Sequence, residues 1–315
     1  MPLDPHAKKL LNLLAASGRG SATRPTVEDR RLAFYSLMHS ANRDQVAECA
    51  VENASFSGPG GPLEIRVYTP HSAKDRISGA LLYFHGGGWV AGGFDTHAGL
   101  CARLAQASGC RIAILDYRLS PEHKFPAALE DGVAAVEWLS AKADIFAIDP
   151  RRLGVCGDSA GANIAAGVCR LTSERGRRLA LQAMLCPILD AVGDTESRRI
   201  FAHGYFLDQE TLEDDLMHYC PPGLDRLDPR LSPLRADDFS ILPPAHIHTA
   251  EFDPVRDEGR FYAEKLATAG ISVTHKCHPG MIHLFYGMPA FIPSADAILR
   301  DVGVAIGTAL SSGRP

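Results

Sequence analysis

LGVCGDSAGAN, residues 153–163, is an apolar run that ends in Gly157 and continues through Ser159 and Gly161 into small residues. The pattern G-x-S-x-G is typical of a tight turn from a β-strand into an α-helix, where larger neighbours of the serine would collide with both elements. Such a turn lifts the serine Oγ above the sheet and directs the first helical N–H groups toward whatever the serine attacks. The stretch therefore predicts a strand, a nucleophilic serine and a helix, in that order.

The composition is that of an ordinary soluble globular protein, with 315 residues of which 46% are hydrophobic and 22% charged. A formal net charge of -5 offers no basic patch for phosphates, so we do not expect nucleic-acid binding. The eight cysteines are scattered without C-x-x-C pairs, which excludes the usual zinc and thioredoxin-like spacings. We expect reduced thiols in a cytoplasmic protein.

The N-terminal residues have some features of a secretory signal. Lys8 and Lys9 precede an apolar run at 10–16, but Asn12 interrupts it and its leucines fit one face of a helix. No run in the chain approaches the roughly 18 apolar residues of a membrane-spanning helix. We therefore expect an amphipathic helix here and no membrane span.

Strand-like and helix-like segments alternate along most of the chain. Residues 80–84, Ala-Leu-Leu-Tyr-Phe, form a continuous apolar run, which is typical of a strand covered on both faces. Further strands are expected at 46–56, 63–68, 111–115, 153–156, 180–185, 245–249 and 271–277, and helices at 4–16, 27–39, 96–108, 127–141, 162–170, 208–218, 258–269 and 293–310. The alternation predicts an α/β fold with a central, mostly parallel, eight-stranded sheet flanked by helices.

One segment interrupts the alternation. Residues from about 191 to 240 are rich in charges and prolines and contain a single clear amphipathic helix, so we interpret them as an insertion that forms a helical cap. The expected organisation is an N-terminal helical part of the cap (1–45), a first part of the α/β core (46–189), the cap insertion (190–240) and a second part of the core (241–315).

A serine needs a base to take its proton and a carboxylate to orient that base. Where the serine sits on such an elbow, the acid and then the histidine follow it in the chain, on loops after later strands. Asp253 directly follows the strand expected at 245–249, and His283 follows a Gly-Met-Ile turn after the strand expected at 271–277. Both therefore fall at the same sheet edge as Ser159.

Each of these two residues has rivals and a structural alternative. Asp253 precedes Pro254 and could be a helix N-cap, while Asp257 is expected inside the following helix. His275 falls within a strand and His278 precedes the turn. Order and placement favour Asp253 and His283.

A glycine-rich loop, His85-Gly86-Gly87-Gly88, follows the buried strand at 80–84. Acyl transfer develops negative charge on the carbonyl oxygen, which preorganised backbone N–H groups stabilise. Glycines let the backbone approach a substrate because no Cβ intervenes. A loop of this kind upstream of the elbow is the arrangement expected for an oxyanion hole.

With these motifs the chain resembles the bacterial hormone-sensitive-lipase-like carboxylesterases, the family IV esterases of the α/β-hydrolase superfamily. The resemblance covers nearly the whole chain, and the motifs occur in the family's order. They are His-Gly-Gly-Gly-Trp (85–89), Asp-Tyr-Arg-Leu-Ser-Pro-Glu (116–122), Gly-Asp-Ser-Ala-Gly-Ala-Asn (157–163), Glu-Phe-Asp-Pro-Val-Arg-Asp-Glu-Gly (251–259) and Gly-Met-Ile-His-Leu-Phe (280–285).

The resemblance implies a Ser-His-Asp triad of Ser159, His283 and Asp253. It implies an oxyanion hole made by the backbone N–H groups of Gly86, Gly87 and Ala160, and a cap over the acyl pocket. The candidates for substrate contact are Phe34, Trp89, Asp158, Tyr205, Phe206, Leu207, Ile282 and Leu284.

Two positions depart from the family pattern. A tyrosine commonly precedes the proline after the sixth strand, whereas this chain has Cys186 before Pro187. A glycine often follows the catalytic histidine, and here that residue is Leu284. Both differences lie beside the expected pocket, so the family's substrate preference transfers less directly than its chemistry.

The expected function is hydrolysis of short- to medium-chain carboxylic esters through an acyl-enzyme, without a metal or an organic cofactor. An amidase, a lactonase or a non-catalytic ligand-binding protein on the same fold remains an alternative. A small ester is the expected partner, and homodimer formation stays open. His246 and His248 share a strand face, but we expect them to be core residues rather than metal ligands.

Overall fold

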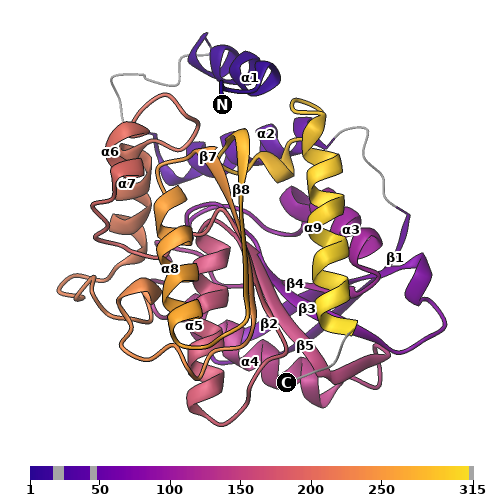
Figure 1. Ribbon diagram of the computed structural model, residues 1–315. Helices are drawn as coiled ribbons and strands as arrows, with labels where there is room; N and C mark the ends of the chain where they lie inside the picture. The colour runs from indigo at the N-terminus through magenta and orange to yellow at the C-terminus, as the bar shows by residue number, and fades with distance from the viewer. Residues whose placement is uncertain (17–24, 43–47, 312–315) are drawn as a thin grey trace.

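An eight-stranded sheet runs through the part of the chain that the computed structural model describes, residues 1–16, 25–42 and 48–311 (Figure 1). The strands lie in the order β1-β2-β4-β3-β5-β6-β7-β8. Their bounds are β1 Cys49–Gly58, β2 Gly61–Pro70, β3 Ser78–Phe84, β4 Arg111–Asp116, β5 Ile148–Asp158, β6 Gln182–Leu185, β7 Ala245–Phe252 and β8 Val273–Ile282. The helices are α1 Pro5–Ala16, α2 Val27–Ala41, α3 Phe94–Ser108, α4 Ala127–Ala141, α5 Ala160–Glu174, α6 Glu196–Ile200, α7 Gln209–Tyr219, α8 Arg256–Thr268 and α9 Ser294–Ser311.

The sheet is mostly parallel, as predicted. β2 pairs antiparallel with both β1 and β4, while β3 pairs parallel with β4 and β5, and β6, β7 and β8 continue the parallel part. Parallel strands are joined by helices that return over a face of the sheet, so the sheet becomes covered on both sides. This confirms the α/β fold with eight strands.

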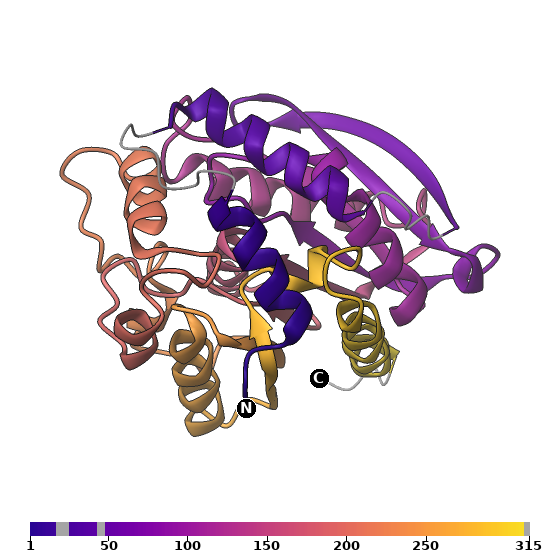
Figure 2. The same ribbon diagram turned by 90° about the horizontal axis from the view of Figure 1, so that it is seen from above.

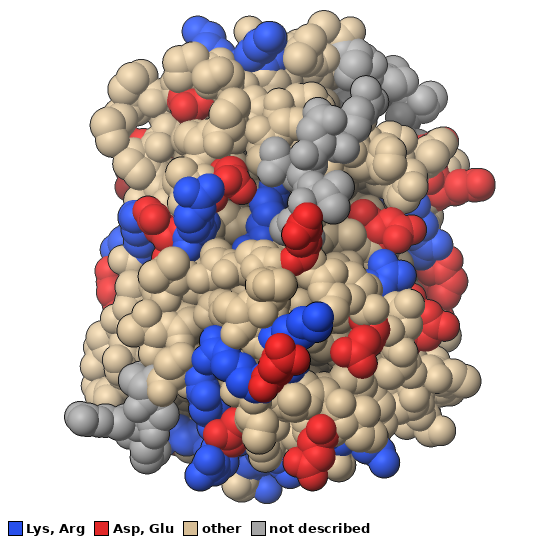
Figure 3. All heavy atoms as spheres, turned by 90° about the vertical axis from the view of Figure 1, so that its right-hand side faces the viewer, with Lys and Arg blue, Asp and Glu red and all other residues tan. Residues whose placement is uncertain are grey.

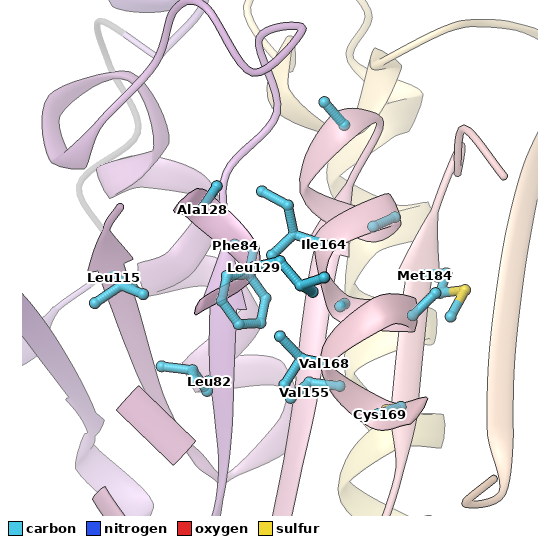
Figure 4. Close-up of a cluster of buried hydrophobic side chains, with 14 of the residues drawn as sticks. Leu82, Phe84, Leu115, Ala128, Leu129, Val155, Ile164, Val168, Cys169 and Met184 are labelled. Atoms are coloured by element: carbon cyan, nitrogen blue, oxygen red, sulfur yellow. The ribbon is translucent and has the colours of Figure 1, made fainter. Parts of the chain in front are cut away.

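The buried strand β3 shows how the two faces are covered. Leu82 and Phe84 pack with residues of α4 and α5, whereas Leu81 and Tyr83 pack with residues of α3 and α9 on the opposite face. Successive side chains of a strand point to opposite faces, so one apolar run serves both layers. Figure 4 shows the first layer, in which Phe84 lies among Leu129, Ile164 and Val168 between the sheet and its helices.

The cap helices gather at one end of the sheet. Seen from above in Figure 2, α1 and α2 cross over this end, and α6 and α7 lie beside them. A backbone hydrogen bond of 2.9 Å from Asp4 N to Gly280 O ties the start of α1 to β8. Two chain segments far apart in the sequence therefore lie over the edge where β5, β7 and β8 end.

Several boundaries differ from the sequence-based expectation. α6 was not predicted, because five residues are too few to show a helical period. β8 continues to Ile282, so the residues expected to turn after Cys277 are strand, paired with β7 up to Phe252 and Ile282. The expected boundary between residues 45 and 46, and the start of the strand expected at 46–56, lie outside the described residues.

The surface carries charges of both signs. On the face drawn in Figure 3, acidic and basic side chains occur together among uncharged residues. Among the described residues, no helix has both the length and the apolar character that crossing a membrane requires.

Candidate active site

Ser159 occupies a strained turn between β5 and α5. Its backbone has φ 53° and ψ -120°, a conformation that L-residues rarely adopt. A Cβ built on Gly157 would lie 2.4 Å from the carbonyl carbon of Gly161, and one built on Gly161 would lie 2.0 Å from the carbonyl oxygen of Phe84. The two glycines are thus required by close backbone packing, which holds the serine at the end of the sheet.

Ser159, His283 and Asp253 form a hydrogen-bonded chain. The Oγ of Ser159 lies 2.8 Å from Nε2 of His283, and Nδ1 of His283 lies 2.8 Å from Oδ2 of Asp253. The other oxygen of Asp253 accepts a hydrogen bond of 3.0 Å from the backbone N–H of Val255. The carboxylate is fully buried, whereas the serine keeps 6% of its surface exposed. This order of groups can pass a proton from the serine to the histidine.

The rival residues lie elsewhere. His278 contacts His248, with 3.2 Å between its Nε2 and Nδ1 of His248, and His275 contacts Thr249 on β7. Asp257 accepts a hydrogen bond of 2.9 Å from the backbone N–H of Ser197, at the start of α6. These side chains have structural partners in the core and the cap.

Cys186 brings a thiol to the same place. It has a positive φ of 46° and lies directly after β6. Its sulfur and one ligand atom each of Asp253 and His283 lie within 4.8 Å of one another. Burial raises the pKa of the Cys186 thiol well above its ordinary value, and the charge of Asp253 adds to the effect. The thiol is therefore a neutral neighbour of the carboxylate.

That trio is the one group of described residues with ligand atoms close enough to hold a metal ion. Its carboxylate and imidazole are already joined to each other by a hydrogen bond. His246 and His248, which share a strand face, have ring centroids 6.4 Å apart, and no third ligand from the described residues joins them.

The oxyanion loop differs from the expectation in one residue. The backbone N–H of Gly86 donates a hydrogen bond of 3.0 Å to Oδ1 of Asp158, so it is not free to bind a substrate oxygen. Gly87 and Gly88 follow with φ values of 121° and 67° and line the cavity beside Ser159. The assignment of Gly86 to the oxyanion hole is therefore wrong, and Gly88 lies where a donor is needed.

Asp158 lies behind the loop and not in the pocket. Its carboxylate has no exposed surface and accepts a hydrogen bond of 2.6 Å from the Tyr83 hydroxyl as well as the one from Gly86. Nε2 of His97 lies 3.2 Å from it. Burial alone would raise the pKa of Asp158, but His97 and the Tyr83 hydroxyl keep it below its ordinary value. The residue is a buried anion that anchors the loop, so its listing as a substrate contact is corrected.

A cavity of about 850 Å³ opens above Ser159 and His283. Phe34 of α2 and Phe206, Leu207 and Leu284 line it, as expected. The volume falls within the usual range for small-molecule sites. A substrate of modest size can therefore reach the serine.

Three other candidates for substrate contact do not line this cavity. Trp89 is stacked on Tyr219 with ring centroids 4.7 Å apart, and Tyr205 is stacked on Phe252 at 5.7 Å. Ile282 has no exposed surface. Their apolar side chains are used to pack the cap and the sheet, which a sequence pattern does not distinguish from substrate contact.

Leu284, the second departure from the family pattern, has a φ of 61°. The left-handed region favours glycine, since a Cβ there is strained by roughly 1–2 kcal/mol. This explains why a glycine suits the position after the histidine. Here a leucine accepts that conformation and places an apolar side chain in the cavity wall.

The sequence gave no indication of one further feature of the cavity. Arg30 of α2 and Asp215 of α7 form an ion pair of 2.9 Å between Nη2 and Oδ2, and both line the cavity. They lie 185 residues apart in the chain and belong to no motif. Charged residues in cap helices are otherwise expected at the solvent surface.

Comparison with known proteins gives concordant results. A family model described as the α/β-hydrolase fold matches residues 81–287. The ethyl acetate hydrolase of Pseudomonas putida is 35% identical over 305 residues, covering 94% of this chain and 96% of that protein. The carboxylesterase NlhH of Mycobacterium tuberculosis is 37% identical over 74% of each chain. The structure of a hyperthermophilic esterase from Pyrobaculum calidifontis superimposes with a TM-score of 0.91 at 34% identity, covering 98% of this chain and 99% of that one.

Proposed function

Since this chain belongs to the hormone-sensitive-lipase-like carboxylic ester hydrolases of the α/β-hydrolase superfamily, we propose that it cleaves short- to medium-chain esters with Ser159 as its nucleophile. The observation that carries this assignment is the hydrogen-bonded chain from Ser159 through His283 to Asp253, with 2.8 Å at each step. The chain ends in a cavity large enough for a small ester.

In the first half of the reaction, Ser159 Oγ attacks the ester carbonyl carbon while Nε2 of His283 takes its proton. The buried carboxylate of Asp253 holds the imidazole in the tautomer that exposes the Nε2 lone pair, and it stabilises the imidazolium that forms. The tetrahedral intermediate collapses when His283 returns the proton to the leaving alcohol. The acyl group is then bound to Ser159.

The oxyanion of that intermediate needs donors that are already in place. The proposed donors are the backbone N–H groups of Gly87, Gly88 and Ala160. Ala160 is the first residue of α5, whose N–H points away from the helix body toward the serine. Gly86 supports them indirectly through its hydrogen bond to Asp158.

In the second half, a water molecule replaces the alcohol. His283 takes a proton from the water, the hydroxide attacks the acyl carbon, and the proton passes to Ser159 Oγ as the acid leaves. The same donors stabilise both intermediates. The residues therefore complete the cycle with no consumption of any group of the protein.

The proposed range of substrates follows from the cavity and from the relatives. Phe206 and Leu284 supply apolar wall, and the cavity of about 850 Å³ has room for an alcohol and a short or medium acyl chain. The relative from Pseudomonas putida is named for ethyl acetate.

Ser159→Ala tests the assignment. The variant should lose hydrolysis of p-nitrophenyl butyrate by about 10⁴-fold or more, because no acyl-enzyme can form. Release of p-nitrophenol measures the rate, and circular dichroism checks that the fold is kept. Labelling of the wild type by a fluorophosphonate, located by mass spectrometry, should be at Ser159.

Labelling at another residue, or turnover of the variant near the wild-type rate, would overturn the assignment. A panel of p-nitrophenyl esters from acetate to palmitate measures the acyl pocket. Matched amides and lactones in the same assay distinguish esterase from amidase and lactonase activity. Cytoplasmic location and homodimer formation stay predictions, and sedimentation measures the second.

A further inference from the structure

The ion pair between Arg30 and Asp215 lies directly against the oxyanion loop. A Cβ built on Gly88 would be 1.8 Å from Oδ2 of Asp215, so the carboxylate touches the glycine backbone. The side chain of Asp215 is 5% exposed, and that of Arg30 is 25% exposed. A buried carboxylate therefore lies beside a backbone segment that is proposed to stabilise negative charge.

This arrangement is electrostatically unfavourable unless the carboxylate is neutralised. Two like charges a few ångströms apart repel strongly where water is excluded, and the oxyanion develops its charge in the transition state. The contact between Nη2 of Arg30 and Oδ2 of Asp215, at 2.9 Å, supplies the opposite charge. Nε of Arg30 is buried and has no acceptor among the described residues, so the guanidinium is not shared with a second carboxylate.

We propose that Arg30 is a positioning residue for ester hydrolysis, which neutralises Asp215 so that the oxyanion forms beside a neutral ion pair and not beside a bare carboxylate. The proposal rests on the proposed function, in which Gly88 belongs to the oxyanion hole. It gives the N-terminal cap helix α2 a part in the chemical step. Contact with substrate is not needed for this role.

The surroundings of Asp215 contain no second cation at comparable distance among the groups that the structure describes around it. Burial raises the pKa of Asp215 to about 6, Arg30 lowers it and Asp214 raises it. The other titratable side chains that line the cavity near these elements are Asp29 on α2, His203 and Asp208 before α7, His218 on α7 and His283. Removing Arg30 should thus raise the pKa of Asp215 further and leave it to ionise within the assay range.

The experiment compares kcat as a function of pH in four variants. Arg30→Gln should add a descending limb above about pH 6, where Asp215 becomes a bare anion, and should lose roughly tenfold or more in kcat by pH 8.5. Arg30→Lys keeps the charge and should show no such limb. The double variant Arg30→Gln with Asp215→Asn should recover most of the kcat that Arg30→Gln loses at high pH.

Arg226→Gln is the matched control. It removes another cap ion pair, between Arg226 and Glu213 at 2.8 Å, which has no contact with the oxyanion loop. This variant should keep the wild-type shape of the pH profile. Thermal melting of each variant separates loss of folded protein from loss of rate.

Two results overturn the proposal. One is an equal effect of Arg30→Gln and Arg226→Gln on the profile, which would make the pair purely structural. The other is a double variant that stays as slow at high pH as Arg30→Gln. Fluorophosphonate labelling of Ser159 in the Arg30→Gln variant keeps the two proposals apart, because labelling persists if only the role of Arg30 is wrong and is absent if Ser159 is not the nucleophile.

Discussion

Asp158 is adjacent to the nucleophile in the chain, yet it faces away from the cavity and holds the oxyanion loop from behind. It accepts hydrogen bonds from the Gly86 N–H and the Tyr83 hydroxyl and lies 3.2 Å from His97. The loop is thereby joined to the elbow at its first glycine. The N–H groups of the next two glycines keep their direction because the first is fixed.

We expect Asp158→Ala to lower kcat by about 10²-fold, the usual effect of losing one oxyanion-hole donor, while KM changes much less. Without the carboxylate, Gly86 N–H and Tyr83 are left buried and unpaired, so the loop has no fixed position. Steady-state kinetics with p-nitrophenyl butyrate measure the split between kcat and KM.

Asp158→Asn is the informative partner, because an amide oxygen can still accept from Gly86. It should retain more of kcat than Asp158→Ala. Asp296→Asn, which removes an exposed carboxylate paired with Arg300, controls for the loss of an ion pair. If the alanine and asparagine variants are equally slow, the hydrogen bond to Gly86 is not what supports the reaction.

At this scale the sequence was most informative where chain order restricts a residue. Ser159, Asp253 and His283 follow three strands at one sheet edge, and the structure brings their side chains together. Gly86 and Gly88 could not be distinguished in the same way. Which N–H of a glycine-rich loop is free depends on backbone angles and on a partner 72 residues away.

The strand-turn-helix element around Ser159 depends on the absence of side chains at two glycines. Gly161 approaches the end of β3, where an added Cβ would lie 2.0 Å from the carbonyl oxygen of Phe84 and 2.6 Å from that of His85. Both neighbours are backbone atoms, which cannot rotate away. Any side chain at Gly161 must move the helix away from the sheet.

Gly161→Ala should therefore lower the free energy of unfolding by about 2 kcal/mol or more and impair activity. Urea denaturation measures the first, and ester hydrolysis the second. Gly223→Ala is the control, since its φ is 79° and nothing lies within 4 Å of the added Cβ. The backbone strain of that variant should cost only about 1–2 kcal/mol, with activity kept. An active Gly161→Ala protein of wild-type stability would contradict this account of the elbow.

Among the elements, the sequence predicted most reliably those whose apolar pattern is repeated and long. The buried strand at 80–84 and the helices over 127–141 and 5–16 were found within a few residues. β8 was expected to end five residues early, because Pro279 and Gly280 suggested a turn. Pairing with β7 continues the strand through them, and such tertiary pairing leaves no local signal.

Buried histidines should make the stability of the whole molecule depend on pH. Burial lowers the pKa of His248 to about 3 and that of His278 to about 4, and each is further lowered by neighbouring positive or titratable groups. Between pH 6.5 and these values the unfolded chain binds protons that the folded chain does not. The stability is fully present above about pH 6.5 and is lost as the pH falls.

Each such histidine should contribute a slope of up to about 1.4 kcal/mol per pH unit below pH 6.5. Urea denaturation at several pH values from 7.5 to 5 gives the slope for the wild type and for His248→Gln. The variant should have a shallower slope, whatever its stability at pH 7.5. Substitution of the exposed His6 supplies the control. An unchanged slope in His248→Gln would show that this imidazole is protonated in the folded protein.

The wall of the cavity and the reacting groups come from different parts of the molecule. Ser159, Asp253 and His283 extend from the ends of sheet strands, whereas Arg30 and Asp215 come from α2 and α7, which contribute nothing to the sheet. In engineering terms, the two cap segments behave as exchangeable cassettes. A library that varies residues 27–41 and 209–219 would search substrate selectivity while leaving the chemistry untouched, provided that the pair joining the two cassettes is kept or replaced together.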